Sequence, residues 1–340
     1  MNLNNLKKTF IIAEIGNNHE GSLERAKRLI MAAKKTGVDA VKFQTFIPDL
    51  FVSPLETKRY KKLKKFQLSF EDFKKLSEFS KKNKITFFST PLDWKSANFL
   101  NKIQKIFKIA SSDSNFYPLI KQIANFNKTI LLSTGMTDLK TIKKSKKFIF
   151  KVWKKKNKIL KKLVIMHCVS SYPVLDKEAN LLAIKTLKDT FKDCVIGYSD
   201  HTLGNSSALA AVALGAKVIE KHFTIDKNFS NFRDHKLSAN PAEMKSLVNN
   251  IRKLEILMGN GKKILQKSEK KTSNYMRRGM VSKKNINVGD RIKNSDIKWI
   301  RVINDIKIDS EKKYLNKKVN RKIRKEQALI KKNFKNINIR

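Results

Sequence analysis

Lysine, carboxylate, hydroxyl and imidazole side chains recur in this sequence at the ends of short apolar segments. Lys42 and Lys108 each lie in such a segment, where a buried ammonium group is costly without an anionic partner. Serine and threonine hydroxyls stand at equivalent points of other segments, and this combination is typical of a site for a phosphorylated acid. The alternative is that the lysines pair with Glu14, Asp113 and Glu220 and have a purely structural role.

His201 and His222 end two successive apolar segments. Neutral imidazoles from neighbouring strands share one divalent cation in many proteins, so the pair is a candidate metal site; a histidine that is merely hydrogen-bonded is the alternative. His167 and Cys168 are adjacent in sequence. Because adjacent strand residues point to opposite faces, we do not expect a thiol–imidazole pair between them, and we expect Cys168 to pack in the core.

The apolar segments are predicted to be eight β-strands that alternate with amphipathic helices. The predicted strands span 9–16, 40–46, 85–91, 106–113, 129–136, 163–172, 194–202 and 217–225, and the helices 22–37, 71–83, 95–103, 118–127, 141–156, 181–191, 206–215 and 242–259. Such alternation predicts an α/β fold with a parallel sheet buried on both faces, and eight units over about 250 residues predict a closed (β/α)8 TIM barrel. An open doubly wound sheet is the alternative, but the glycine-rich turn that would favour it is missing after the first strand.

The predicted barrel occupies residues 1–260 and carries the catalytic site, because functional residues of this fold lie at the C-terminal ends of the strands. Residues 261–279 are polar and basic and are predicted to be a linker. Residues 280–340 contain short strand-like segments and are predicted to form a small β-rich domain. Such a domain buries little core alone, so we expect it to pack against a partner barrel.

The composition excludes several classes of protein. The 340 residues include 75 Lys+Arg and 29 Asp+Glu, a formal charge of +46, but the basic residues are spread along the whole chain. Zinc-finger spacing and an arginine-rich recognition helix are missing, so we predict no specific nucleic-acid partner. No apolar stretch is long enough for membrane insertion, the start does not match a signal peptide, and two cysteines suit a reducing compartment, which together predict a cytoplasmic protein.

The segments resemble, in order, the motifs of the sialic acid synthase family, which includes N-acetylneuraminate, legionaminate and pseudaminate synthases. The motifs that carry the resemblance are AEIGNNHEGS, AVKFQTF, FFSTP, FKIASSD, LLSTGM, HCVSSYP, GYSDHTLG and IEKHFTID. They run through essentially the whole predicted barrel. The C-terminal segment resembles the antifreeze-like (SAF, β-clip) domain of that family.

The resemblance implies a transferase that condenses phosphoenolpyruvate with an N-acylated aldose and water. The aldose would be N-acetylmannosamine or a diacetamido-dideoxyhexose, and the products a nine-carbon 2-keto sugar acid for cell-surface polysaccharide, and phosphate. A divalent metal, Mn²⁺ or Mg²⁺, and a domain-swapped homodimer are also implied.

The resemblance also assigns roles to individual residues. It implies phosphoenolpyruvate binding by Lys42, Thr90, Lys108, Ser111, Ser133, Ser170, Tyr172 and Ser199. It implies sugar binding by Glu14, Gln44, Asp113, Asp234 and, from a second chain, Arg301, and metal binding by His201 and His222. The catalytic set would be Glu14, Lys42, Lys108 and Asp113, with Glu14 stabilising positive charge at C2 of phosphoenolpyruvate or managing the proton of water.

Three rival functions remain open from the sequence. One is a synthase that condenses phosphoenolpyruvate with a sugar phosphate, which the lack of an obvious second phosphate pocket argues against. Another is an aldolase that forms a Schiff base on Lys42 or Lys108. The third is a non-catalytic barrel that serves as a binding module, which the retained lysines, histidines and acids argue against.

Overall fold

The computed structural model describes residues 6–154, 163–302 and 311–334. The chain divides into two compact units, Met1–Gly259 and Asn260–Arg340, which are described separately below. The end of the helix predicted at 141–156, and residues 303–310 and 335–340 of the predicted C-terminal domain, lie outside the described residues.

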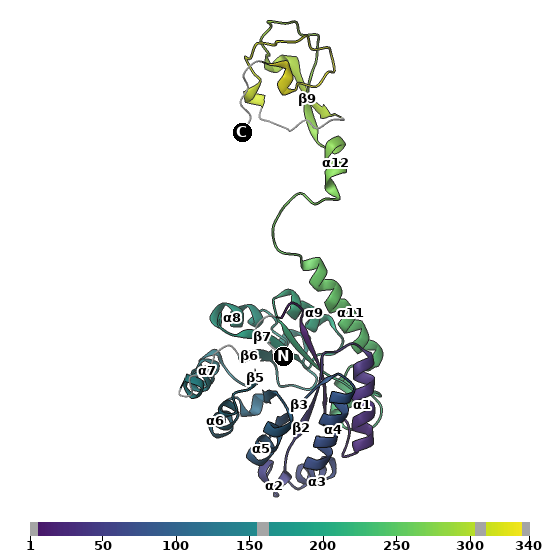
Figure 1. The fold of residues 1–340 in the computed structure, drawn as a ribbon, viewed down its shortest axis with the longest axis vertical. Helices are drawn as coiled ribbons and strands as arrows, with labels where there is room; N and C mark the ends of the chain where they lie inside the picture. The colour runs from purple at the N-terminus through teal and green to yellow at the C-terminus, as the bar shows by residue number, and fades with distance from the viewer. Residues whose placement is uncertain (1–5, 155–162, 303–310, 335–340) are drawn as a thin grey trace. The chain divides into compact units, whose positions relative to one another are not determined.

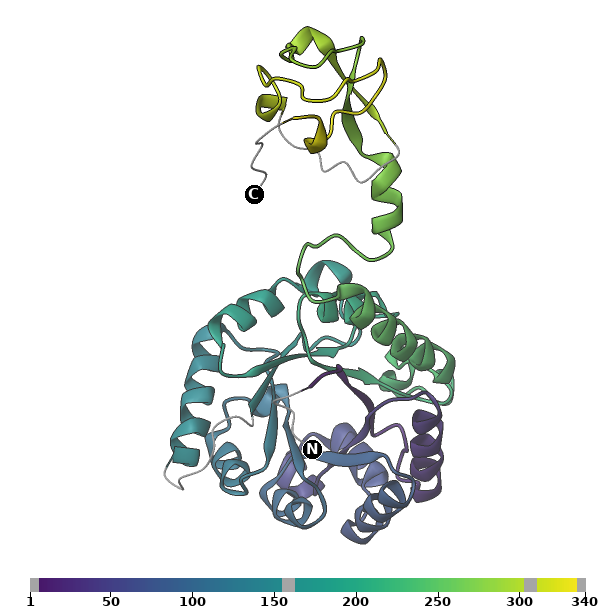
Figure 2. The ribbon, with the colours of Figure 1, turned by 45° about the horizontal axis from the view of Figure 1, so that its top comes forward.

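Eight parallel strands form the sheet of the first unit (Figure 1). They are β1 (Phe10–Gly16), β2 (Ala40–Thr45), β3 (Thr86–Pro91), β4 (Ile106–Ile109), β5 (Thr129–Ser133), β6 (Leu163–Cys168), β7 (Val195–Asp200) and β8 (Val218–His222). Their order is β3-β2-β1-β8-β7-β6-β5-β4, and β3 also packs beside β4, so the sheet makes a nearly closed ring (Figure 2). The predicted (β/α)8 barrel is confirmed.

Helices form the outer layer of the barrel (Figure 1). The predicted ones are α1 (Leu23–Lys35), α4 (Phe70–Lys82), α5 (Trp94–Ile103), α6 (Tyr117–Asn125), α7 (Leu139–Lys154), α8 (Ala183–Thr190), α9 (Ser206–Ala213) and α11 (Pro241–Met258). Three others were not predicted: α2 (Pro48–Phe51) and α3 (Thr57–Phe66), which follow β2, and α10 (Arg233–Leu237), which follows β8. These three helices lie in the connections after β2 and β8, outside the eight strand–helix units that the sequence predicted.

Side-chain caps set where several outer helices begin. The Ser22 side chain accepts from the backbone of Arg25 at the start of α1. Ser69 with Asp72 begins α4 with a reciprocal capping box, in which each side chain satisfies a backbone N–H that has no partner within the helix. The same arrangement of Asn240 and Glu243 begins α11. These caps fix the register of the helices against the strands.

Two apolar layers fill the barrel unit. Alternate strand residues such as Ile11 and Val41 pack outward against the helices, while Phe10, Ile12 and Phe88 pack inward with their counterparts from other strands. The inward layer is fully apolar at the N-terminal end of the ring and closes it. Toward the C-terminal strand ends the same inward positions become polar, so the sheet itself provides a polar cavity above an apolar floor.

The second unit is small and contains a two-stranded antiparallel sheet. Strand β9 (Arg278–Ser282) pairs with β10 (Ile297–Arg301), and short 3-10 turns and isolated bridges make up much of the rest. Its own core is apolar and consists of Met280, Ile286, Ile292, Ile297, Tyr314, Val319, Ile323, Leu329 and Phe334. Helix α12 (Glu269–Met276) lies in the segment predicted to be a linker.

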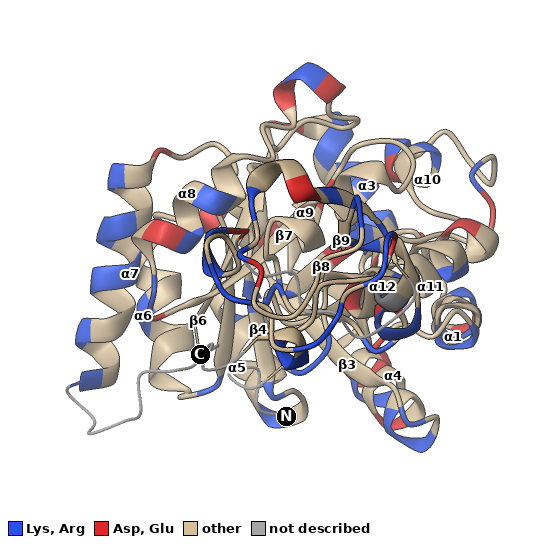
Figure 3. Cartoon of the chain, turned by 90° about the horizontal axis from the view of Figure 1, so that it is seen from above, with Lys and Arg blue, Asp and Glu red and all other residues tan. Residues whose placement is uncertain are grey.

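Basic side chains are spread over the surface of the chain. Figure 3 shows lysine and arginine recurring along outer helices such as α4 and α7. Within the described part of the chain, no helix combines the length and apolarity needed to cross a membrane.

Candidate active site

A cavity of about 720 Å³ opens at the C-terminal ends of the barrel strands. It gathers residues from all eight strand ends and the loops that follow them. The predicted site residues that line it are Glu14, Lys42, Gln44, Thr90, Lys108, Ser111, Ser133, Ser170, Tyr172, Ser199, His201, His222 and Asp234. The barrel therefore brings residues separated by more than two hundred positions into one cavity.

Two predicted site residues lie elsewhere. Asp113 ends a 3-10 turn after β4, and its neighbours Ser111 and Ser112 line the cavity instead. Burial raises the pKa of Asp113 to about 6. Arg301 ends β10 in the second unit, where it stands opposite Arg278. Their predicted contacts with the sugar stay predictions.

Four ionisable side chains form one buried network at the floor of the cavity. The Lys42 ammonium lies 2.7 Å from Glu14 and 3.7 Å from Glu220, and Lys108 lies 2.8 Å from the other oxygen of Glu220. All four side chains are at most 5 % exposed. The alternative from the sequence was that the two lysines pair with Glu14, Asp113 and Glu220. The pairs with Glu14 and Glu220 exist, whereas Asp113 forms no ion pair with either lysine in the described structure.

The two carboxylates of this network have opposite pKa shifts. Burial raises the pKa of Glu14 to about 7 against the attraction of Lys42, and the charge of Glu220 adds to the increase. Burial also raises the pKa of Glu220, but Lys108 and Lys42 outweigh it and lower that pKa to about 2. Glu220 is therefore the permanent counter-ion of the lysines. Glu14 is the group that can exchange a proton near neutral pH.

Hydroxyl groups surround the lysines on the β4–β6 side of the cavity. Among the described residues the buried Ser133 hydroxyl has no hydrogen-bond partner. The backbone N–H of Gly135 donates to the Ser111 hydroxyl at 3.1 Å. A Cβ at Gly135 would collide with the hydroxyls of Ser111 and Ser170, so only glycine leaves room for this group of donors. Hydroxyls beside two ammonium groups suit an anion with several oxygens.

His201 and His222 lie together on the β7–β8 side, with ring centroids 5.4 Å apart. His201 Nδ1 is 2.8 Å from the carbonyl of Val169, which can only accept, so Nδ1 carries the hydrogen and Nε2 has the lone pair. Burial lowers the pKa of His222 well below its usual value, and its Nδ1 has no hydrogen-bond partner among the described residues. Burial lowers the pKa of His201, but the Cys168 sulfur and the Val169 carbonyl outweigh it and raise that pKa above its usual value. His222 therefore offers a lone pair to a cation, and His201 offers one when its ring is neutral. The described residues contain no cluster of three or more acidic, histidine or cysteine ligands.

Cys168 has a contact that sequence reasoning missed. Its sulfur lies 3.8 Å from His201 Nδ1 on the neighbouring strand, and the residue lines the cavity. His167 points away and hydrogen-bonds the Ala179 carbonyl at 2.8 Å, as the alternation of strand residues predicts. The expectation that Cys168 only packs was incomplete, because the partner comes from another strand.

Other cavity residues were also not assigned a role from the sequence. Glu220 had a usable signal, because it precedes His222 by two positions on one strand and so shares its face. Others that line the cavity include Asn17, Arg59, Lys62, Phe66, Phe232 and Arg233. Arg59 and Lys62 lie on α3, which was not predicted, so nothing in the sequence placed them at the cavity.

A second buried ion pair lies directly behind the histidines. Lys221 donates to Asp200 at 2.7 Å and to the Thr202 carbonyl at 3.0 Å, and both charged side chains are at most 2 % exposed. The other oxygen of Asp200 accepts from the backbone and hydroxyl of Thr202, at 2.9 and 2.7 Å. Asp200 precedes His201 and Lys221 precedes His222, so this pair fixes the backbone from which both imidazoles project.

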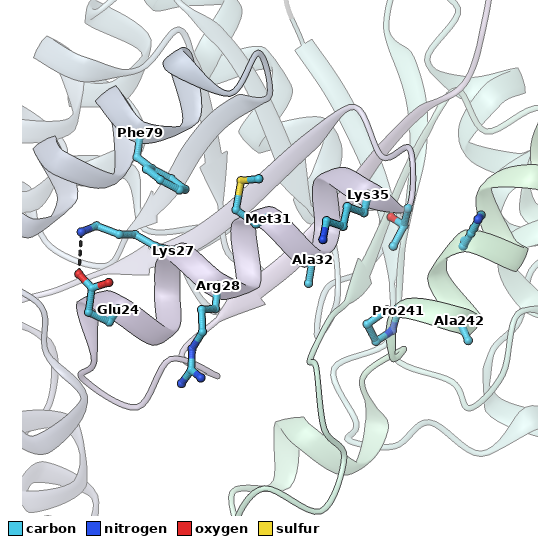
Figure 4. A pocket seen from close by; sticks show the side chains of 11 residues that line it. Glu24, Lys27, Arg28, Met31, Ala32, Lys35, Phe79, Pro241 and Ala242 are labelled. Carbon is cyan, nitrogen blue, oxygen red and sulfur yellow. Dashed lines mark hydrogen bonds and ion pairs between the residues drawn. The ribbon is translucent and has the colours of Figure 1, made fainter.

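A groove of about 650 Å³ also lies on the outside of the barrel, between α1, α4 and α11 (Figure 4). Its lining includes Met31, Phe79 and Pro241, and the Glu24–Lys27 pair at 2.6 Å lies on α1. The groove lacks paired titratable groups of the kind found at the strand ends, so the strand-end cavity is the candidate active site.

Comparison with known proteins identifies the family. The model of the NeuB family matches residues 29–263. The chain belongs to the NeuB family. The predicted resemblance to sialic acid synthases is thereby confirmed.

Several relatives extend the NeuB assignment beyond the barrel. The N,N'-diacetyllegionaminic acid synthase of Campylobacter jejuni is 41% identical over 96% of this chain and 99% of its own length. The N-acetylneuraminate-9-phosphate synthase of Drosophila melanogaster is 37% identical over 70% of this chain and 66% of its own. The N-acetylneuraminic acid synthetase structure from Leptospira borgpetersenii, in complex with citrate, has a TM-score of 0.71 at 36% identity and covers 80% of this chain and 92% of its own.

The buried pair behind the histidines generates a stability prediction. Asp200→Asn leaves the Lys221 ammonium buried without a counter-ion, so we expect the free energy of unfolding of the barrel to fall by about 3–5 kcal/mol in urea titrations. The double variant Asp200→Asn/Lys221→Met should recover most of this loss. Asp193→Asn, which breaks the exposed Lys146–Asp193 pair at 2.6 Å, is the control and should cost about 1 kcal/mol or less. Equal losses in Asp200→Asn and the control would contradict the assigned role.

Proposed function

We propose that this NeuB-family chain is a transferase that condenses phosphoenolpyruvate with an N-acylated aldose and water. The products are a nine-carbon 2-keto sugar acid and phosphate. The observation that carries the proposal is the buried network of Lys42, Lys108, Glu14 and Glu220 beside the unpaired Ser133 hydroxyl, other hydroxyls and two histidines in one strand-end cavity. The relatives differ in the sugar acid that they make, so family membership alone leaves the aldose open.

The floor of the cavity supplies the binding site for phosphoenolpyruvate. Its carboxylate and phosphate bring up to three negative charges, which need positive charge and hydrogen-bond donors in a buried place. Lys42 already donates to the Thr90 hydroxyl at 3.2 Å. Lys108 lines the same cavity as the serine hydroxyls at the ends of β4, β5 and β6. The predicted ligands Ser111, Ser133, Ser170, Tyr172 and Ser199 complete this site.

The histidines fit a divalent cation, Mn²⁺ or Mg²⁺. The donor set supports this assignment, since burial keeps His222 neutral and the Val169 carbonyl orients a neutral His201 so that Nε2 is available. The raised pKa of His201 means that a cation binds there in competition with a proton. Two protein ligands leave the remaining positions to water and substrate. When bound, such a cation supplies Lewis acidity toward an aldehyde oxygen or a water molecule.

Glu14 is the group that we assign to proton handling. C3 of phosphoenolpyruvate attacks the aldehyde carbon, whose oxygen takes up a proton and becomes a hydroxyl, while positive charge develops at C2. Water adds at C2 and loses one proton. The C–O bond to phosphate then breaks as the new C2 hydroxyl gives its proton to the departing phosphate and becomes the keto group. A carboxylate at Glu14 stabilises the positive charge and accepts the proton of water, and its pKa near 7 matches that task. Both lysines are held as ammonium counter-ions of carboxylates, so no Schiff base is required of them.

The sugar is proposed to bind above the floor, against Gln44 and Asp234. Gln44 donates to Glu14 at 3.2 Å and accepts from Asn17 at 2.9 Å, which places its amide beside the proton-handling carboxyl. We also propose that Asp113 contacts the sugar and that Arg301 reaches it from a second chain in a domain-swapped homodimer. The proposed location of the enzyme is the cytoplasm.

A phosphate-release assay tests the function directly. Purified protein with Mn²⁺, phosphoenolpyruvate and N-acetylmannosamine or a diacetamido-dideoxyhexose should release phosphate in proportion to a nine-carbon keto acid detected by mass spectrometry. No release with any acylated aldose would favour the non-catalytic barrel. Covalent trapping of pyruvate on Lys42 or Lys108 by borohydride would favour the aldolase.

Lys108→Met should weaken phosphoenolpyruvate binding. Loss of a charge-assisted hydrogen bond is worth about 1.5–3 kcal/mol, so we expect its KM to rise by about 10- to 100-fold. Lys105→Met, an exposed lysine just before the same strand, is the matched control and should behave as wild type. A rise confined to the KM of the sugar would show that the lysine has a different role.

His201→Ala and His222→Ala should each weaken Mn²⁺ binding more than about tenfold, measured by electron paramagnetic resonance of the free ion, because each removes a ligand. His167→Gln is the control, since that ring bonds a backbone carbonyl outside the cavity. Activity should fall in parallel in both alanine variants. Full activity of both in the presence of chelator would exclude the metal assignment.

A further inference from the structure

Three cations lie at the mouth of the candidate active site and have no assigned role. Arg59, Lys62 and Arg233, here called the rim cations, line the same cavity as the buried network, yet they are exposed. Arg59 and Lys62 are one turn apart on α3 and therefore share a helix face. Arg233 begins α10, which follows β8 and is distant from α3 in the sequence.

Aromatic contacts bring two of the rim cations, Lys62 and Arg233, to the same side of the cavity, while the Arg59 guanidinium lies 5.5 Å from the ring centre of Phe51. The Lys62 ammonium lies 4.4 Å from the ring centre of Phe232, and the Phe232 and Phe66 rings pack edge to face at 5.1 Å. The guanidinium of Arg233, the residue next to Phe232, lies 4.6 Å from the ring centre of Tyr172. Helix α3 and the start of α10 therefore meet at this side of the mouth, with their cationic groups held over rings.

Asp234 is the acidic neighbour of two rim cations, because burial raises the pKa of its carboxyl while Arg233 and Lys62 both act to lower it. Arg59 and Lys62 form no ion pair with any residue in the described ranges. Arg233 donates through Nε to Asp234 at 3.3 Å, which leaves both terminal guanidinium nitrogens without an acidic partner among the described residues. The buried lysines differ, because each is already balanced by Glu14 or Glu220.

The lysine-rich composition does not account for the rim. Residues 1–259 contain only five arginines, Arg25, Arg28, Arg59, Arg233 and Arg252. Two of these five line this one cavity. Guanidinium groups bind phosphoryl oxygens in a bidentate fashion, which a lysine of a solvated helix face does not.

The position of the rim relative to the floor indicates which part of a substrate it would meet. In the reaction proposed above, the aldehyde carbon of the aldose must touch phosphoenolpyruvate at the floor. The apolar layer below closes the barrel, so the rest of the sugar chain points to the mouth. The Tyr172 ring packs on the His201 ring with centroids 4.2 Å apart, and the Arg233 guanidinium lies over the same Tyr172 ring. The Arg233 guanidinium and the His201 imidazole therefore contact the same tyrosine ring.

We infer that the rim cations bind a phosphoryl group on the terminal carbon of the aldose, so that the preferred substrate is an N-acylated aldose phosphate. This inference rests on the proposed function and specifies its sugar. It also answers the objection that the barrel has no second phosphate pocket: that pocket is built from a helix that the sequence did not reveal.

The test compares kcat/KM for N-acetylmannosamine 6-phosphate and for N-acetylmannosamine in the phosphate-release assay. Mass spectrometry of the product shows whether the sugar phosphate is retained, and so whether the released phosphate came from C2 of phosphoenolpyruvate. Wild-type protein should prefer the phosphorylated sugar by at least about 100-fold, since even two of the three charge-assisted contacts, each worth about tenfold or more, give that factor. Arg59→Ala, Lys62→Ala and Arg233→Ala should each reduce this preference by at least about tenfold. Lys64→Ala, on the same helix but outside the cavity, should leave it unchanged.

The outcomes separate this inference from the proposed function. Turnover of the unphosphorylated sugar or of a diacetamido-dideoxyhexose with equal or higher kcat/KM would overturn the phosphoryl site and leave the condensation standing. Rim variants that raise only the KM of phosphoenolpyruvate would also overturn it, since the cations would then serve the other substrate. Absence of phosphate release with every aldose would overturn both.

Discussion

The structure of the candidate site depends on one constraint: four ionisable groups are buried side by side at the floor of the strand-end cavity, above the apolar layer of the barrel. Taking charges out of water costs several kcal/mol for each ion, and mutual attraction offsets this only when the geometry is close. Lys42 and Lys108 satisfy the condition through Glu220, which contacts both. Glu14 completes the set 2.7 Å from Lys42, and burial together with the charge of Glu220 holds its pKa near 7 despite this contact. An entering anion therefore meets a site whose charges are already arranged and need little reorganisation.

Much of the barrel could be predicted from the sequence, because eight apolar segments alternate with amphipathic ones. The inward-facing residues followed from the period of two along a strand, which placed Lys42 and Gln44 correctly on one face. The predicted strands were mostly too long at their C-terminal ends. β4 stops at Ile109 because the next residues form a 3-10 turn, and this turn also directs Asp113 away from the cavity.

The parts that could not be predicted come from contacts between distant segments. Cys168 meets His201 across two strands, and Phe66 meets Phe232 across two loops. Helix α3 has a charged sequence with few apolar residues, and Phe66 is its one fully buried residue, so it lacks the apolar segment by which the other helices were recognised. The sequence also does not say how a second unit with its own small core would contribute Arg301 to a barrel.

The strict alternation along β7 and β8 has a consequence for how these strands can change. Asp200 and Lys221 face the helices, while their immediate neighbours His201 and His222 face the cavity. Inserting or deleting one residue in either strand would exchange the two faces. It would turn an imidazole toward the apolar layer and leave a charged group without its partner. The lengths of β7 and β8 are therefore restricted more tightly than their compositions. Changes that keep the site intact are substitutions within these strands and changes in the loops that follow them.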